Sequence, residues 1–233
     1  MSAITADAVA RDELLAKLRV LGKRMKEYPI MFSDSMVPAI LDGRKTVTRR
    51  IVRSLPSEYY QVVQSSAGWW GFFTGDEMSG HHAYAMVKCP FGVPGDRLWV
   101  REAWRTGKAA DRFPPRTLNT CDPIQYAADN ATINLNTLPD FGGWSDRLRS
   151  PLHMPRWASR LTLEVVSVRA ERLHEVTEED AEREGIDDSD AMIGQVSHPY
   201  VTAFASLWES INGHGSWAQN PWVWRIEFRV VPA

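Results

Sequence analysis

The most constraining feature of the sequence is an alternating segment close to the C-terminus, at 224–230. Apolar and charged residues follow one another along it, the apolar ones being Trp224, Ile226, Phe228 and Val230 and the charged ones Arg225, Glu227 and Arg229. A period of two puts the apolar side chains on one face of a strand and the charged ones on the other. The segment therefore predicts a strand of an antiparallel sheet with one buried face.

Helical and strand patterns both occur elsewhere, which predicts a mixed α+β protein. β-Branched or aromatic segments predict strands at 29–32, 46–52, 97–104 and 161–168, and aromatic strands within 57–87 with a loop at 75–80. Apolar residues at helical spacing and capping signals predict helices at 5–28, 37–42, 177–184 and 202–211. With 233 residues, the chain is long enough for one domain with elaborations.

Composition and charge exclude several classes of function. The net charge is −2, so any nucleic-acid surface has to be local. Cys89 and Cys121 lack CxxC spacing, which argues against a disulfide scaffold or a zinc site and is typical of a reducing cytoplasm. The adjacent His81 and His82 would diverge on a strand and make a poor metal site. No apolar run reaches the roughly 18 residues of a membrane helix, and charged residues interrupt the N-terminal segment. We expect a cytoplasmic protein without a membrane partner or a metal.

Potential chemistry is concentrated at 43–50, which reads Gly-Arg-Lys-Thr-Val-Thr-Arg-Arg. Gly43 ends the predicted helix, because glycine takes the left-handed conformation without a steric penalty, and a strand follows. Lys45 therefore lies in the turn, whereas Thr48 and Arg50 share one face of the strand. If the Lys45 side chain folds back toward them, an amine, a hydroxyl and a guanidinium converge.

Two interpretations of this cluster stay open from the residues alone. A threonine hydroxyl becomes a nucleophile when an adjacent base takes its proton, and a lysine is such a base only when it is neutral. Burial and nearby positive charge both lower the pKa of a lysine. Four arginines crowd Lys45 in the sequence, namely Arg44, Arg49, Arg50 and Arg53. The same arginines are also typical of a basic surface turn that binds phosphate without chemistry, and the residues alone favour this second interpretation.

The run at 43–50 resembles the glycine-x-lysine signature, ending in arginine, of the ASCH domain, a compact β-barrel of the PUA-like group associated with RNA. More narrowly, it is similar to the bacterial N4-acetylcytidine amidohydrolase branch, in which a lysine, a threonine and a glutamate form the proposed catalytic set. The resemblance places that lysine at Lys45, that threonine at Thr48 and the following arginine at Arg50. It implies an α+β, PUA-like barrel with flanking helices. Arg49 departs from the family pattern, which has an apolar residue there, and makes the pocket more basic.

The glutamate of that set falls in the predicted helix at 177–184. Thr177 with Asp180 forms a start like a capping box, and Gly185 supplies the stop. Glu184 is unusual, because a carboxylate at a helix C-terminus faces the negative end of the helix dipole, which costs about 0.3–1 kcal/mol unless a cationic partner offsets it. The family's alanine-glutamate-x-glutamate run matches 181–184, so the resemblance places the catalytic glutamate at Glu184.

The resemblance covers five blocks in the family order and leaves several segments outside. We expect an N-terminal helical extension at 1–28, an ASCH-like domain at 29–233, and insertions at about 57–88 and 106–150. The second insertion is expected to cap a site. The apolar stripe of the N-terminal helix is expected to pack against the barrel or against a second subunit in a homodimer.

These expectations combine into a hypothetical mechanism for an amidohydrolase. Neutral Lys45 takes the proton of Thr48, and Thr48 attacks the amide of an N4-acylated cytidine or a related modified nucleoside or nucleotide. Arg50 or a backbone amide stabilises the oxyanion, while Glu184 positions Lys45 and passes a proton to the leaving amine. No metal or organic cofactor is required.

Two further residues are candidate substrate contacts. Arg44 adds positive charge beside Lys45. Trp157 lies in a segment, 154–160, that resembles a feature of larger, phage-type ASCH proteins near the barrel opening. At that place a tryptophan could stack on a base. A tryptophan beside a strand is also an ordinary core residue. The alternatives to a hydrolase are a non-catalytic RNA-binding module, a ribonuclease, and a structural or partner-binding phage protein.

Overall fold

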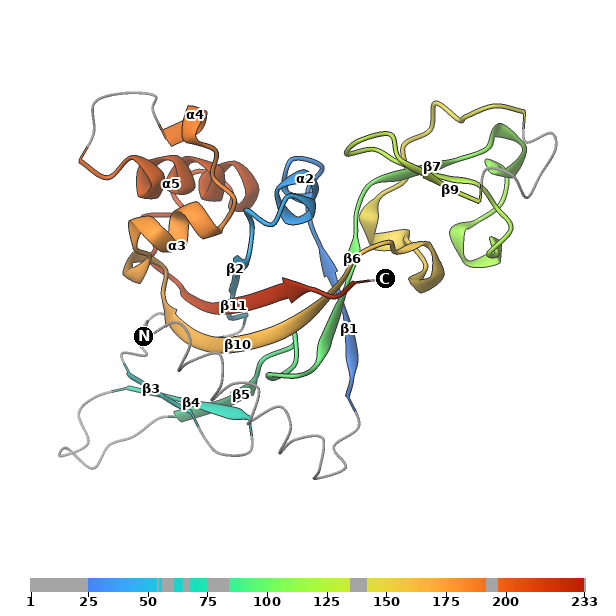
Figure 1. Cartoon of the computed structure of the whole chain (residues 1–233). Coiled ribbons are helices and arrows are strands. Elements are labelled where there is room, and N and C mark those ends of the chain that lie inside the picture. Colours follow the sequence, from blue (N-terminus) through green and yellow to red (C-terminus); the bar gives the residue numbers. More distant parts are fainter. Residues whose placement is uncertain are drawn as a thin grey trace, which may run out of the picture.

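A computed structural model describes residues 25–53, 55, 61–64, 68–74, 84–134, 142–191 and 197–232 of the chain (Figure 1). Most of the predicted N-terminal helix, with its proposed role in a homodimer, lies outside these residues, as do His81, His82 and the loop at 75–80. The helix prediction is wrong at its end. Glu27 and Tyr28 belong to strand β1 (Glu27–Met31), because they pair with a neighbouring strand.

Five strands form the main sheet. Their order is β1, β6 (Arg97–Arg101), β10 (Thr162–Arg172), β11 (Trp222–Val230) and β2 (Val47–Ile51). β1 pairs parallel with β6, and the other pairs are antiparallel. The mixed α+β class is thereby confirmed.

The expected closure of this sheet into a barrel is not found among the described residues. β1 and β2 are its two edges, and no ladder joins them. The Arg50 side chain instead spans the space from β2 to β1, where its Nη2 donates to the carbonyl of Met31 at 2.6 Å. Hydrogen-bonded strands lie only about 4.8 Å apart, so a guanidinium between these two edges keeps their backbones from pairing.

The alternation predicted for β11 is confirmed at Trp224, Ile226 and Phe228 but not at Val230, which is exposed near the end of the strand. Both faces of β11 are covered along most of its length. Trp224, Ile226 and Phe228 lie in the main core, which also contains Phe32, Trp70 and Phe72. On the opposite face Arg225 is only 5% exposed. That face is buried because helices pack over it.

Two helices, α3 (Glu178–Arg183) and α5 (Pro199–Asn212), cover this second face, and Figure 1 shows them above the main sheet. The short helix α4 (Asp188–Ala191) packs against α5. α3 begins as predicted, since the Thr177 side chain accepts from the Asp180 amide. Phe204 and Trp208 of α5 pack with Val223 of β11 in a second core cluster. No helix in the described part of the chain combines the length and the apolar character that a membrane crossing requires.

A short helix connects the two edge strands. α2 (Met36–Leu41) follows β1 and leads into β2, and its buried residues Val37, Ala39 and Ile40 attach it to the core. Gly43 follows with a φ of +75°, the left-handed conformation predicted for this stop. The turn after it places Lys45 beneath α2, where the Lys45 amide donates to the carbonyl of Ala39.

Two small sheets flank the main one. β3 (Gln61–Gln64), β4 (Trp69–Phe73) and β5 (Tyr84–Lys88) form the first, and Trp70 and Phe72 join the main core. β7 (Trp104–Thr106), β8 (Ile124–Tyr126) and β9 (Thr132–Ile133) form the second.

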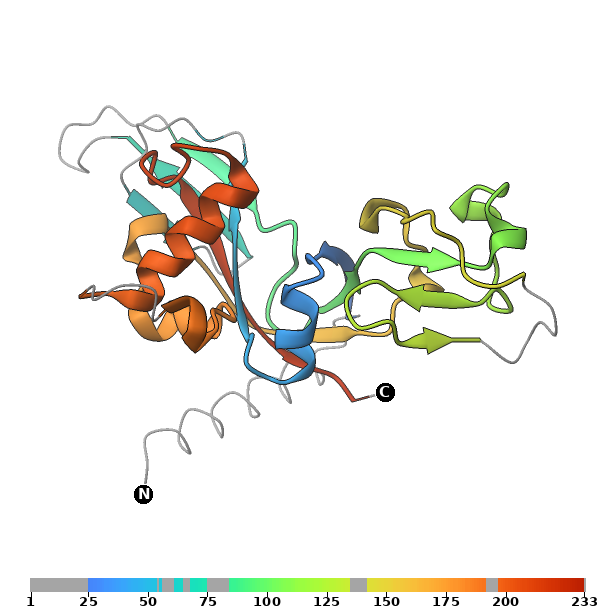
Figure 2. The same cartoon turned by 90° about the horizontal axis from the view of Figure 1, so that it is seen from above.

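The second small sheet belongs to a lobe that projects to one side, most clearly in Figure 2. The lobe has its own core, made of Trp104, Ala110, Leu118, Ile124, Tyr126, Met154 and Ala158. Short 3-10 turns complete it: η1 (Lys108–Ala110), η2 (Pro115–Thr117), η3 (Pro151–His153) and η4 (Arg156–Ala158). A further turn, η5 (Leu173–Glu175), follows β10 in the main body.

Candidate active site

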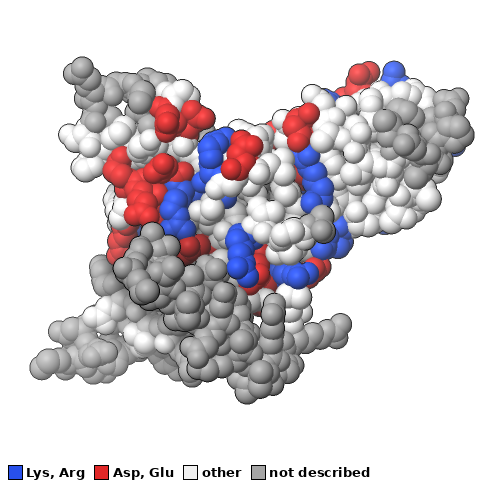
Figure 3. Space-filling model, viewed as in Figure 1, with Lys and Arg blue, Asp and Glu red and all other residues white. Residues whose placement is uncertain are grey.

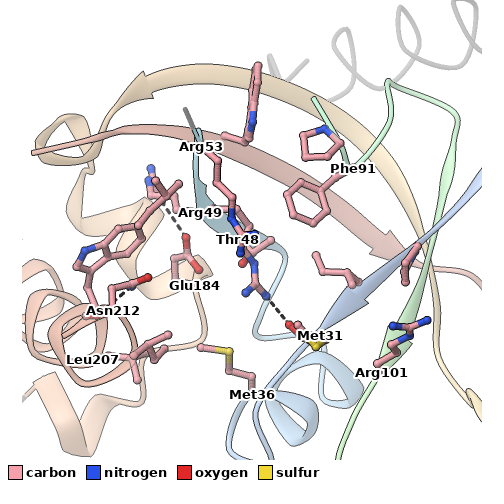
Figure 4. A pocket seen from close by; sticks show the side chains of 18 of the residues that line it. Met31, Met36, Thr48, Arg49, Arg53, Phe91, Arg101, Glu184, Leu207 and Asn212 are labelled. Atoms are coloured by element: carbon pink, nitrogen blue, oxygen red, sulfur yellow. Dashed lines mark hydrogen bonds and ion pairs between the residues drawn. The ribbon is translucent and has the colours of Figure 1, made fainter. Parts of the chain in front are cut away.

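A pocket of about 700 Å³ lies between the two edges of the main sheet (Figure 4). Residues 29–31 of β1 line one side and 48–51 of β2 line another, while Phe204, Leu207 and Trp208 of α5 contribute apolar surface. A volume of this size is typical of sites for small ligands. The open seam of the sheet is therefore a candidate site for a small ligand.

Lys45 and Glu184 meet next to this pocket, although they are 139 positions apart in the sequence. The Lys45 amine donates to Glu184 Oε2 at 2.8 Å, to the Glu184 carbonyl at 2.6 Å and to the Val47 carbonyl at 3.1 Å. The carbonyl of Glu184 is at the end of α3, so Lys45 is the cationic partner predicted for this helix terminus. Gly185 permits the close approach: its φ is +87°, and an added Cβ would lie 3.0 Å from the Cβ of Lys45.

The contacts of Lys45 match an ammonium group. Its side chain is fully buried, and three acceptors surround the amine, one for each of three protons. Burial lowers the pKa of Lys45, and the Glu184 carboxylate opposes that shift. No hydrogen bond joins the amine to the Thr48 hydroxyl in the described part of the chain. The predicted convergence of Lys45 with Thr48 and Arg50 is therefore wrong for Lys45.

Thr48 lies on β2 opposite Ile226 and lines the pocket. No described residue hydrogen-bonds to its hydroxyl, which distinguishes it from Thr46, whose hydroxyl accepts from Arg183. Arg50 follows two positions later on the same face, as predicted, and also lines the pocket. Thr48 and Glu184 thus line the same pocket (Figure 4). Lys45 binds Glu184 but is not one of the lining residues.

The backbone of β2 also presents polar groups at this edge. The carbonyl of Thr46 and the amide of Val52 bond to β11. Because such groups alternate along an antiparallel ladder, the N–H and C=O of Arg49 point away from β11, toward the open edge.

The sequence interpretation missed the role of Arg49. Its side chain is fully buried and binds three acids: Glu171 at 2.8 Å, Asp180 at 2.7 Å and Glu184 at 3.3 Å. Arg225 also binds Asp180, at 2.6 Å. Two signals could have revealed this network. Arg49 falls on the opposite face of the strand from Thr48, and Asp180 and Glu184 are four apart, hence on one face of a helix.

Opposing effects determine the protonation of Asp180. Burial raises the pKa of Asp180, but its hydrogen bonds to Arg225 and Arg49 outweigh burial and hold the pKa at about 2. Asp180 is therefore ionised across the neutral range, and the network fixes α3 and Glu184 against β2 and β11.

Two predicted substrate contacts do not line the pocket. Arg44 is exposed and pairs with Asp42 and Asp187, beside a separate hollow to which Glu184 also contributes. Trp157 packs against the core of the lobe, because η4 turns it toward that cluster. The cap expected from the second insertion is likewise not formed over this pocket by its described residues, since 106–134 and 142–150 build the lobe instead.

The described residues contain no group of three or more His, Cys, Asp or Glu arranged to hold a metal ion. The carboxylate oxygens of the acids near the pocket are paired with arginine and lysine side chains.

Comparisons with protein families, with curated proteins and with solved structures find no match for this chain.

Proposed function

We propose that this protein is an amidohydrolase of the PUA-like ASCH type, which removes the acyl group from an N4-acylated cytidine or a related modified nucleoside. One observation carries the proposal: a threonine hydroxyl with no hydrogen bond and a fixed carboxylate, Thr48 and Glu184, line the same pocket. Lys45 and Arg49 hold that carboxylate in place from behind. A nucleophile and a fixed proton acceptor within one pocket are the groups that acyl transfer requires.

The contacts of Lys45 modify the mechanism expected from the sequence. Because the amine already donates three hydrogen bonds, we assign the proton transfers to Glu184 and an orienting role to Lys45. Glu184 takes the Thr48 proton as the oxygen attacks the amide carbon, and the amide C–N bond then breaks. The proton passes to the leaving N4 amine. Water finally hydrolyses the ester on Thr48: Glu184 accepts a proton from the water as its oxygen attacks the ester carbon, and returns that proton to the Thr48 oxygen as the C–O bond breaks and the acid leaves.

Two groups are suited to the oxyanion formed in this attack. The Arg50 guanidinium lies on the same face as Thr48, and the Arg49 amide points to the open edge of the strand. A donor at this position contributes about 3–4 kcal/mol to transition-state stabilisation in enzymes where it has been removed.

The test is incubation of the protein with N4-acetylcytidine, with cytidine and acetate measured by mass spectrometry. Thr48→Val removes the hydroxyl at nearly constant volume and should lower kcat/KM by at least about 1,000-fold, whereas Thr48→Ser keeps measurable activity. The acetylated peptide containing Thr48 should be detectable after rapid quenching. Full activity of a folded Thr48→Val variant, or no acetate release by the folded wild type, would refute the hydrolase.

A second candidate is binding of a modified nucleotide without chemistry. It is favoured by the absence of any hydrogen bond that would activate the Thr48 hydroxyl in this state. Binding alone tolerates Thr48→Val, and a shortened oligonucleotide in the same incubation would indicate a ribonuclease instead.

A further inference from the structure

Four cations on the wall of the pocket have no carboxylate partner among the described residues. They are Arg50, Arg53, Lys88 and Arg101. Glu184 is the single carboxylate among the described lining residues, and Lys45 and Arg49 already pair with it. The wall therefore carries an excess of positive charge that no carboxylate of the described residues neutralises.

The four cations converge from separate parts of the chain. Arg50 lies on β2 and Arg53 shortly after it, whereas Lys88 ends β5 and Arg101 ends β6. In Figure 4, Arg53 and Arg101 lie on opposite sides of the pocket, with Thr48 between them. An anionic group bound here would lie within reach of the proposed nucleophile.

Aromatic rings hold three of these cations without neutralising them. Arg50 lies over Phe32 at 5.1 Å, Lys88 over Trp69 at 4.4 Å and Arg101 over Trp99 at 4.4 Å. Such contacts restrict the side chains and leave their charge available.

Two of the lining arginines, Arg50 and Arg101, also keep unused donors. Arg50 donates to the Met31 carbonyl and Arg101 to the Leu152 carbonyl at 3.1 Å. The Nε of each is buried and has no partner in the described part of the chain. Buried donors are nearly always satisfied in folded proteins, and the N–H groups of a guanidinium match the oxygens of a phosphate.

The size of the pocket favours one nucleotide over a polymer. Its 700 Å³ lies within the range for a single small ligand. On the face shown in Figure 3, Lys and Arg are interspersed with Asp and Glu, and no continuous basic track crosses the visible described surface. A polyanion gains affinity mainly from such tracks.

We propose that the pocket recognises a phosphorylated nucleoside, with its phosphate bound by Arg53 and Lys88 and its base directed toward Thr48. The assignment of the base rests on the proposed function. The phosphate assignment rests on the unpaired cations alone, so the two can be tested separately.

The experiment measures binding to the full-length Thr48→Val protein by calorimetry at low salt. The paired probes are cytidine 5′-monophosphate against cytidine, and N4-acetylcytidine 5′-monophosphate against N4-acetylcytidine. In each pair the phosphorylated probe should bind at least about tenfold more tightly, and the preference should decrease as salt is added. Arg53→Gln with Lys88→Gln should remove most of that preference. Arg116→Gln, an exposed arginine of η2 outside the pocket, is the matched control and should keep it.

Each outcome separates the two proposals. Equal affinity within both pairs overturns the phosphate inference, even if the wild type releases acetate. A phosphate preference without acetate release supports the inference while the hydrolase fails. An oligonucleotide containing N4-acetylcytidine that binds tenfold more tightly than the mononucleotide overturns the choice of a single nucleotide.

Discussion

Lys45→Met should destabilise the fold by about 3–5 kcal/mol, the cost of removing one partner from a buried ion pair. Methionine is unbranched and of similar length, so packing is largely kept. The substitution takes the donor away from three acceptors, namely Glu184 Oε2, the Glu184 carbonyl and the Val47 carbonyl. Only Arg49, at 3.3 Å, then remains on the carboxylate. For a chain of 233 residues, each kcal/mol shifts Tm by about 2–4 °C, which predicts a decrease of roughly 6–20 °C.

The assay is thermal and urea unfolding followed by circular dichroism, with two comparisons. Arg44→Met is the matched control, because Arg44 is the exposed neighbour whose ion pairs lie in solvent, and it should change stability by less than about 0.5 kcal/mol. Lys45→Met combined with Glu184→Leu removes both charges and should lose less than the sum of the single variants. A loss below about 1 kcal/mol for Lys45→Met, or strict additivity in the double variant, would refute the role of Lys45 as the charged support of Glu184.

Three further predictions follow from the described contacts. The pKa of Asp180 is about 2 in the folded protein, which is below its value in the unfolded chain. The ionised carboxylate therefore stabilises the fold above about pH 4, and this contribution is lost as the pH falls toward 2. Asp180→Asn should reduce the pH dependence of the unfolding free energy in this range by roughly 2 kcal/mol, as acid unfolding would show. Burial raises the pKa of the Cys89 thiol to about 12, so iodoacetamide at pH 8 should modify exposed Cys121 and spare Cys89 until urea unfolds the chain, as peptide mass spectrometry would show. Trp157→Ala should lower the thermal stability of the lobe and leave nucleoside affinity within about twofold, whereas a large loss of affinity would return Trp157 to the binding site.

Local patterns in the sequence predicted much of the secondary structure around the site. The alternation at 224–230, the capping residue Thr177 and the stops at Gly43 and Gly185 all correspond to observed features. These features depend on a few neighbouring residues and on backbone conformation, so periodicity and residue type are sufficient to predict them.

Contacts between distant segments were not predictable in the same way. The sequence placed Arg49 beside other cations, whereas the three acids that bind it come from β10, from α3 and from the C-cap of α3. An aromatic residue beside a strand, such as Trp157, fits a base-stacking role and a core position equally well. Only the packing of the fold places Trp157 against the core of the lobe. No local rule indicates which of several apolar clusters a side chain will join.

The sequence by itself determined the α+β class, the turn that carries Lys45 and the strand that carries Thr48, because these follow from the spacing of neighbouring residues. The tertiary structure decided the rest. The sheet stays open between β1 and β2, and Glu184, 139 positions away in the sequence, lies in contact with Lys45. The Lys45 amine donates its three hydrogen bonds to Glu184 and Val47. The physical reason is that a buried charge takes whichever partners the packed fold brings within hydrogen-bond distance, and those partners are set by long-range packing.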